Sequence, residues 1–189
     1  MCASFLRVCM LFVLILIANS CSKDSDPGPD NSDSYYLRFT LDGVKKEYKM
    51  FTYVQFKYDQ DHLTHNGYVL ASLTSDPTKE VLSFFLYSKQ EYQKGQEYDV
   101  QNEVLLSGTN AKLPQLTMVY IDKDDKSYTA QFPDSPTLQS LGIKHEAKLV
   151  FSEITNDHVK GTFSAKVFSE FPEKESLIVT DGEFLLKRN

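Results

Sequence analysis

The highest concentration of residues able to hold a metal ion lies in one short polar segment. Asp59 and Asp61 stand beside His62-Leu-Thr-His65, so two carboxylates and two imidazoles fall close together. These are ordinary zinc ligands, but the helical His-Glu-x-x-His spacing is absent. The four residues are therefore weak metal candidates, and a solvated loop between two strands is the favoured interpretation.

Other combinations of reactive residues give weaker signals. Asp122, Asp124 and Asp125 resemble the start of a calcium loop, but Ser127 and Pro133 stand where an EF-hand needs Gly and Glu. A charged turn is favoured there over a weak surface calcium site. The chain lacks a Gly-x-Ser-x-Gly motif, and its four histidines have no triad context. Paired carboxylates of a glycosidase stay open, because such pairs meet only in the fold. We expect no catalytic residue, no bound metal and no cofactor.

The N-terminus has the layout of a secretory signal peptide. Arg7 precedes an apolar run from Val8 to Ala18, and small Ser20 stands directly before Cys21. A cysteine at that point resembles the lipid-attachment box of bacterial lipoproteins, although that pattern usually has Leu where Ala18 stands. The resemblance implies a signal peptide over residues 1–20 and a lipid on Cys21 that binds the membrane.

Two alternatives to lipid attachment remain open. Cleavage by ordinary signal peptidase would leave Cys21 unmodified. A retained membrane anchor needs about 20 apolar residues, and the run from Val8 to Ala18 has eleven. Lipid attachment is the favoured reading.

Removing residues 1–20 limits the possible chemistry further. The other two cysteines lie in the signal peptide, so lipidation of Cys21 would leave no thiol for a disulfide, a zinc site or a nucleophile. The remaining chain has 19 basic and 26 acidic residues, a net charge of −7. This balance argues against a nucleic-acid partner. Residues 21–34 are polar and acidic and predict a flexible tether, which leaves residues 35–189 as a single domain.

Strand patterns dominate that domain. Period-two alternation or apolar runs predict strands over residues 35–41, 49–58, 67–74, 80–88, 115–121, 127–132, 148–154, 158–168, 176–180 and 182–187. Asn156-Asp157 predicts a two-residue hairpin turn with left-handed backbone. Asp181-Gly182 predicts a bulge or bend. Ser135-Pro136 predicts one short helix that ends at Gly142.

These elements predict an all-β domain of about nine to eleven strands. Short connections favour antiparallel pairing. We expect a mostly antiparallel β-sandwich, with a partly closed β-barrel as the alternative. Phe151, Val159, Phe163 and Phe184 are expected in the core.

Two stretches resemble the C-terminal half of Bacteroides-type outer-membrane lipoproteins. They are Lys160-Gly161-Thr162-Phe163-Ser164 and Thr180-Asp181-Gly182-Glu183-Phe184. The resemblance implies a small C-terminal β-domain and carries no catalytic residues. Lys23, Asp24 and Asp26 resemble the short signal that sends such lipoproteins to the cell surface. The expected location is thus the outer membrane of the cell envelope, with surface exposure as the further expectation.

The remaining signal is aromatic: eleven Tyr and thirteen Phe, with no Trp. Packing in the core and across strands accounts for most of these rings. The favoured function is a non-catalytic surface module that binds an extracellular glycan or protein. A surface hydrolase and a structural, fimbria-like subunit are the alternatives.

Overall fold

The computed structural model describes residues 35–73, 78–170 and 174–189. The expected signal peptide, the expected tether and Cys21 lie outside the described residues.

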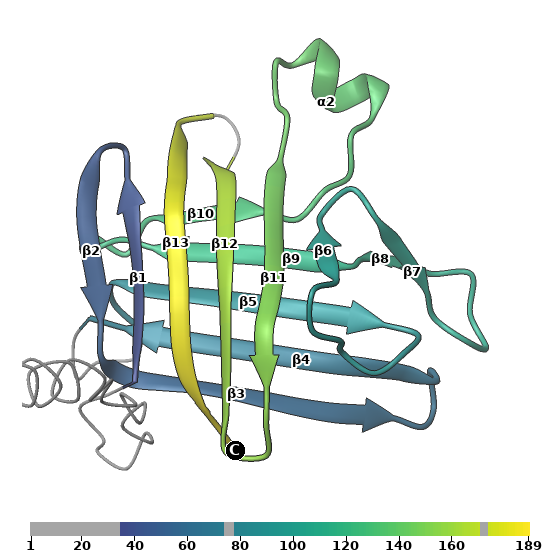
Figure 1. Ribbon diagram of the computed structural model, residues 1–189. Coiled ribbons are helices and arrows are strands. Elements are labelled where there is room, and N and C mark those ends of the chain that lie inside the picture. Colours follow the sequence, from purple (N-terminus) through teal and green to yellow (C-terminus); the bar gives the residue numbers. More distant parts are fainter. Residues whose placement is uncertain (1–34, 74–77, 171–173) are drawn as a thin grey trace, which may run out of the picture. The chain divides into compact units, whose positions relative to one another are not determined.

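Two layers of strands run across each other (Figure 1). The front layer contains β1 (Tyr36–Leu41), β2 (Val44–Tyr48), β11 (Glu146–Ile154), β12 (His158–Ser169) and β13 (Ser176–Arg188). The back layer contains β3 (Met50–Asp59), β4 (Thr64–Ser72), β5 (Val81–Ser88), β9 (Leu116–Ile121) and β10 (Ser127–Ala130). A short β6 (Glu97–Asp99) pairs with β11, while β7 (Glu103–Leu105) and β8 (Lys112–Pro114) form a small separate sheet.

The strands of both layers form one hydrogen-bonded sheet in the order β2-β1-β13-β3-β4-β5-β9-β10-β12-β11-β6. β12 also pairs with β13, so the order returns to the front layer. The layers join at two places, where β10 pairs with β12 and where the end of β13 pairs with β3. The second junction is parallel and all other ladders are antiparallel. The expected all-β, mostly antiparallel, sandwich-like fold is confirmed.

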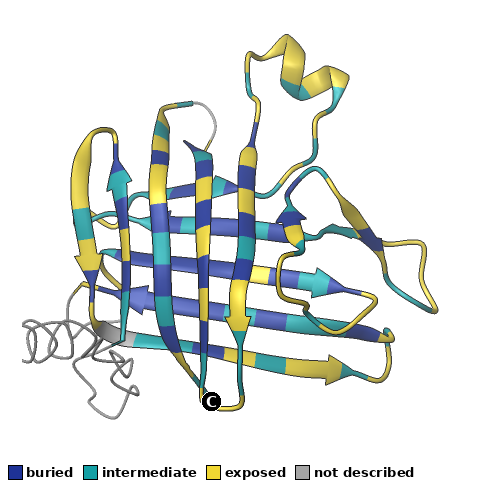
Figure 2. Ribbon diagram, viewed as in Figure 1, coloured by how far each residue is buried: buried dark blue, intermediate teal, exposed yellow. Residues whose placement is uncertain are grey.

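The core lies between the layers and is rich in aromatic rings. Phe151, Val159, Phe163 and Phe184 are all buried, as expected. Along β12, Figure 2 shows buried and exposed residues in alternation, as period two requires. The rings of Phe84, from the back layer, and Phe163, from the front layer, lie 4.9 Å apart between centroids. Ring contacts of this kind hold the layers together in a domain whose described residues contain no cysteine.

Two glycines let these rings lie on the backbone of the front layer. A Cβ on Gly161 would lie 2.5 Å from Cζ of Phe184, and one on Gly182 would lie 2.6 Å from Cδ2 of Phe163. Such distances leave no room for a methyl group, so each glycine accommodates the ring of the neighbouring strand. The bulge expected at Asp181-Gly182 is confirmed, because Asp181 has a φ of 51° and the register with β12 shifts there.

The hairpin between β11 and β12 is confirmed in position, but its turn differs from the expectation. Neither Asn156 nor Asp157 has a positive φ. The Thr155 hydroxyl instead accepts hydrogen bonds from the backbone N–H groups of Asp157 and His158, at 3.2 and 2.9 Å. A side-chain hydroxyl therefore supports this turn, and left-handed backbone is not needed.

The single expected helix is α2 (Pro136–Ser140). The Ser135 hydroxyl caps it by accepting from the Leu138 backbone N–H, and Gly142 follows with a φ of 71°. Among the described residues, the pattern missed the short strands β2, β6, β7 and β8, and it divided β13 into two. The three residues of β6, β7 or β8 are too few to show a period, and β2 has three charged residues in succession, Lys45, Lys46 and Glu47, so it shows no alternation. β13 continues through its bulge.

Candidate functional site

The acidic histidine segment forms the turn between β3 and β4. One Asp59 carboxylate oxygen accepts from the backbone N–H groups of Asp61, at 3.0 Å, and His62, at 3.2 Å. The other carboxylate oxygen lies 2.9 Å from Nδ1 of His62. The hydrogen bond from the His62 side chain is the main cause that holds the pKa of Asp59 below its ordinary value. Asp59 thus stabilises a turn, as the favoured interpretation predicted.

His65 lies away from that turn, on β4. Its ring packs against Tyr58, with 4.8 Å between centroids, and its carbonyl accepts from the Tyr92 hydroxyl at 2.7 Å. The structure thus brings the side chains of Asp59 and His62 together. Asp61 contributes its backbone N–H to the same turn, and the His65 ring packs against Tyr58 on β3. Within residues 35–73, 78–170 and 174–189, no three His, Cys, Asp or Glu side chains are grouped as a metal site would require.

His158 makes a further set of contacts, which the sequence did not reveal. At the tip of the β11–β12 hairpin, His158 Nε2 lies 3.2 Å from a Glu153 carboxylate oxygen, and Nδ1 lies 3.2 Å from the Thr155 hydroxyl. The order carboxylate, imidazole, hydroxyl is that of a hydrolase triad. However, the Thr155 hydroxyl donates its proton to the His158 carbonyl at 2.9 Å. The hydroxyl proton is therefore used in the turn. In a triad the nucleophile would instead donate this proton to the imidazole.

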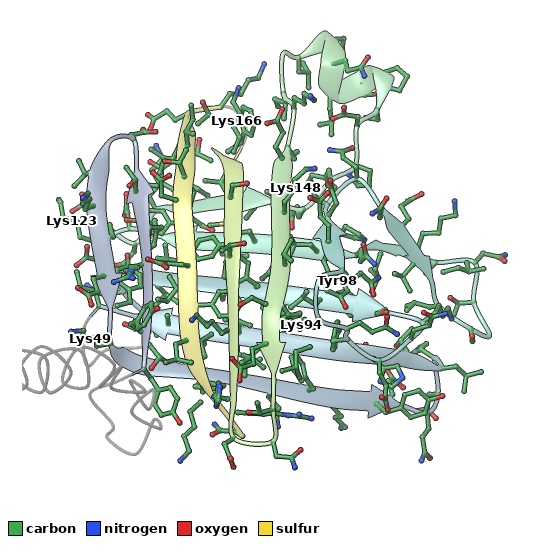
Figure 3. All side chains as sticks on the ribbon, viewed as in Figure 1. Lys49, Lys94, Tyr98, Lys123, Lys148 and Lys166 are labelled. Atoms are coloured by element: carbon green, nitrogen blue, oxygen red, sulfur yellow. The ribbon has the colours of Figure 1, made fainter. Side chains whose placement is uncertain are left out.

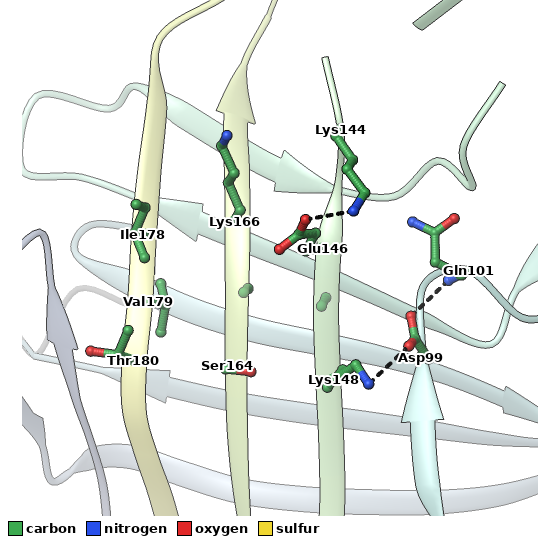
Figure 4. A pocket seen from close by; sticks show the side chains of 12 residues that line it. Asp99, Gln101, Lys144, Glu146, Lys148, Ser164, Lys166, Ile178, Val179 and Thr180 are labelled. Atoms are coloured by element: carbon green, nitrogen blue, oxygen red, sulfur yellow. Dashed lines mark hydrogen bonds and ion pairs between the residues drawn. The ribbon is translucent and has the colours of Figure 1, made fainter. Parts of the chain in front are cut away.

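The outer face of the front layer carries a hollow of about 480 Å³ (Figure 4). Lys148 and Lys166 project from β11 and β12 there (Figure 3). Lys148 Nζ lies 2.7 Å from a Glu97 carboxylate oxygen and 3.6 Å from one of Asp99. Ion pairs continue across this face from Lys144 to Glu146 and from Arg38 to Glu183.

These front-face charges are exposed and largely matched with one another. Exposed pairs of this kind contribute little to stability, because water and salt screen them. The hollow has both carboxylates and ammonium groups on its walls, so it favours no single sign of ligand charge. We regard the front face as a hydrated, charged surface.

The outer face of the back layer has a different composition. Residues opposite the core positions of β3, β4, β5 and β9 share it, and we call them the aromatic face. Its members are Tyr53, Gln55, Lys57, Asn66, Tyr68, Leu70, Ser72, Val81, Ser83, Phe85, Tyr87, Thr117, Val119 and Ile121. Lys57 carries a charge, and Asp59 follows it on the same side of β3 at the end of the strand. The front face presents many ions, whereas the aromatic face carries mainly rings, hydroxyls, amides and aliphatic side chains. Its members Leu70, Ser72, Val81 and Ser83 are buried.

Strand register brings Tyr68 and Phe85 side by side in one row, with Tyr53 diagonal to Tyr68. Gln55 pairs with Tyr68, Tyr68 with Phe85, and Phe85 with Thr117 across four neighbouring strands. The Tyr68 and Phe85 rings lie 4.9 Å apart with an interplanar angle of 36°. Tyr53 meets Tyr68 edge to face, at 6.1 Å and 66°.

The row remains accessible at one end. Phe85 is 37% exposed, although it lies in the middle of a long strand. Tyr68 is half-buried, and burial is the main cause that raises the pKa of its hydroxyl. Both rings therefore lie on the solvent side of central strands.

Sequence reasoning did not single out the row, because it assigned most rings to packing. A signal was nevertheless present in residues 81–88, Val-Leu-Ser-Phe-Phe-Leu-Tyr-Ser, where both faces of the strand carry apolar side chains. An antiparallel strand with one face in water normally alternates apolar and polar residues. The breakdown of alternation identifies a second surface that is partly removed from water.

The structural alternative would need an open strand edge. β2 is the outermost strand beside β1, and its residues include Lys45, Lys46 and Glu47. Charged side chains of this kind oppose pairing with a further strand. The edge therefore offers no specific support for a fimbria-like subunit.

Comparisons with family profiles, with curated proteins and with solved structures gave no match for this chain. In the part of the chain that the structure describes, no helix has the length and apolar character needed to cross a bilayer.

Proposed function

We propose that this protein is a lipid-anchored, non-catalytic module of the cell envelope that binds an extracellular glycan or protein through its aromatic face. The observation that carries the proposal is the ring cluster Tyr53, Tyr68 and Phe85 on a surface with few charges. Aromatic rings desolvate readily and provide much contact area at little conformational cost.

The N-terminal sequence supports the location in this proposal. A lipid on Cys21 would hold the chain in the outer membrane, and a tether over residues 21–34 would reach at most about 50 Å when fully extended. The acidic net charge keeps the domain from lying flat on anionic lipid. Such a module can present its binding face outward, away from the membrane.

The non-catalytic character rests on the hydrogen bonding of the candidate residues. The His62 side chain contacts the Asp59 carboxylate within a turn, and the Thr155 hydroxyl donates to a backbone carbonyl. Neither arrangement provides an activated nucleophile or a metal-bound water.

The test compares two substitutions of the same kind on opposite faces. Phe85→Glu places a carboxylate in the ring row, and Ile178→Glu places one on the front face, where Ile178 is 50% exposed. The mature protein and both variants are applied to arrays of glycans and extracellular matrix proteins. We expect at least one array component to bind both the mature protein and the Ile178→Glu variant. The Phe85→Glu variant should not bind that component.

Two results would overturn the proposal. One is equal binding by both variants, which would place the contact elsewhere. The other is turnover of an arrayed substrate that survives Phe85→Glu, which would favour the hydrolase alternative.

A further inference from the structure

We infer that the ligand of the aromatic face is an uncharged glycan chain, which packs against Tyr68 and Phe85. This inference rests on the proposed function and narrows it to one ligand class. It is carried by the geometry of the two rings, by the polar groups beside them, and by the distribution of charge over the domain.

The platform is a tilted stack of two rings. Tyr68 and Phe85 lie directly opposite each other on β4 and β5, with 4.9 Å between centroids and 36° between planes. Rings this close and this nearly parallel pack face to face on each other, so together they form one apolar ridge on the sheet. Phe85 is 37% exposed, and the C–H groups of a sugar ring can pack against this ridge.

Tyr53 has a different part in the platform. Its ring meets that of Tyr68 at 66°, so the two cannot lie flat against the same ligand. Edge-to-face contact of this kind restricts the neighbouring ring. Tyr53 is therefore a positioning residue that holds Tyr68 from the side.

Uncharged polar side chains border the platform. Gln55 precedes Tyr68 in the cross-strand row and is exposed, and Thr117 follows Phe85 at the other end. Amide and hydroxyl groups both donate and accept hydrogen bonds. Sugar hydroxyls have the same dual character, so these side chains can pair with them in either sense.

The charge distribution selects an uncharged glycan over an acidic one. The chain carries a net charge of −6, and the aromatic face offers Lys57 as its only positive side chain. An acidic polysaccharide would meet repulsion from the domain without a group of cations to offset it. An uncharged chain meets no such barrier.

A protein partner fits the face less well. Protein interfaces commonly surround an apolar centre with a polar rim and are enriched in Tyr, Phe and Arg. Here amides and hydroxyls lie directly beside the rings, and the face contains no Arg. This mixture suits hydroxyl-rich ligands, and protein binding becomes an outcome that the experiment can detect.

The experiment is affinity electrophoresis of the mature protein in native gels. Separate gels contain an uncharged polysaccharide (galactomannan, xyloglucan, amylopectin or mixed-linkage β-glucan) or an acidic one (polygalacturonate or heparin). We expect retardation by at least one uncharged polysaccharide and none by the acidic ones. Tyr68→Ala should weaken that binding at least about tenfold, the effect of removing a central contact.

Matched variants separate binding from folding. Tyr36→Ala makes the same truncation on β1 of the front layer and should leave retardation unchanged. Gln55→Glu changes an exposed side chain, so it should preserve the fold while it weakens binding by adding charge beside the platform. If Tyr68→Ala unfolds, Gln55→Glu still decides the question.

The outcomes also separate this inference from the function on which it rests. Binding of an arrayed protein through Phe85, without retardation by any uncharged polysaccharide, would overturn the glycan and preserve the binding module. Retardation only by acidic polysaccharides, or retardation unaffected by both Tyr68→Ala and Gln55→Glu, would also overturn it. If the mature protein binds nothing on the arrays and is not retarded in any gel, both the glycan inference and the proposed binding function are overturned.

Discussion

Single residues of this protein show how tightly the two layers are packed. The ring of Phe163 lies within 6.3 Å of the rings of Phe39, Phe84 and Phe184, measured between centroids. These neighbours come from β1, β5 and β13, so one side chain joins both layers.

Truncating this ring should remove contacts in both layers at once. We expect Phe163→Ala to lower the free energy of unfolding by about 3–5 kcal/mol, the usual cost of losing a buried aromatic ring. Denaturant-induced unfolding measures it. The neighbouring Thr162→Ala, on the exposed side of the same strand, should change stability by less than about 0.5 kcal/mol. A cost below about 1 kcal/mol for Phe163→Ala would contradict its place in the core.

A single added methyl group should also be costly at Gly161. The new Cβ would meet the Phe184 ring and the Val150 carbonyl oxygen, and the carbonyl cannot move without breaking the sheet. We expect Gly161→Ala to destabilise the domain by about 1–3 kcal/mol. Part of this cost should be recovered when Phe184→Leu is added, because a smaller side chain relieves the contact with the ring. Strictly additive losses in a double-mutant cycle would refute the ring contact.

At the scale of elements, two polar side chains connect the protruding loop with α2 to the turn after β6 and to β10 (Figure 1). Gln101 accepts from the Asp134 backbone N–H at 2.8 Å and donates to the His145 carbonyl at 2.7 Å. His145 Nδ1 lies 3.0 Å from the Thr129 carbonyl oxygen. The buried imidazole packs between Phe132 and Phe168 at the base of the loop.

Burial of this imidazole predicts a pH dependence. Desolvation lowers the pKa of His145 below its ordinary value of 6.5, against a smaller opposing effect of the Thr129 hydrogen bond. As pH falls below 6.5, the unfolded chain binds a proton before the folded chain does, so stability should decrease. The decrease should end once pH passes the lowered pKa of the folded state.

The contribution of His145 can be isolated by difference. Unfolding free energies of the natural protein and of His145→Gln are measured from pH 7.5 downward, because the other histidines remain in both. The natural protein should lose more stability than the variant below pH 6.5. Parallel curves would show that His145 does not titrate differently on folding.

At the scale of the whole molecule, the proposed lipid anchor determines where the domain acts. If Cys21 is diacylated, the mature N-terminus carries two acyl chains on its side chain. Cys21→Ala should then release the protein from the membrane fraction. Mass spectrometry of the N-terminal peptide measures the added lipid directly, and an unmodified terminus in the natural protein would favour ordinary secretion.

The two outer faces also define the molecule as a whole. One is covered by ion pairs such as Lys148 with Glu97, and the other carries Tyr68 and Phe85 with few charges nearby. This asymmetry distinguishes the charged face from the face where the proposed ligand would bind.

Much of this architecture was readable from the sequence, because its causes are local. Alternation along residues 158–168 predicted which side of β12 is buried, since successive strand residues point to opposite faces. The Ser135 cap, the Asp181-Gly182 bulge and the position of the β11–β12 hairpin also depend on a few neighbouring residues.

The candidate site could not be read in the same way, because it depends on pairing between distant strands. Tyr53, Tyr68 and Phe85 become neighbours only through the register of β3 with β4 and of β4 with β5. A shift by one residue would turn Tyr68 into the core. The sequence determined a ring-rich β-domain behind a signal-like N-terminus. Tertiary structure decided which rings face outward together, because register is chosen by the packing of the whole core.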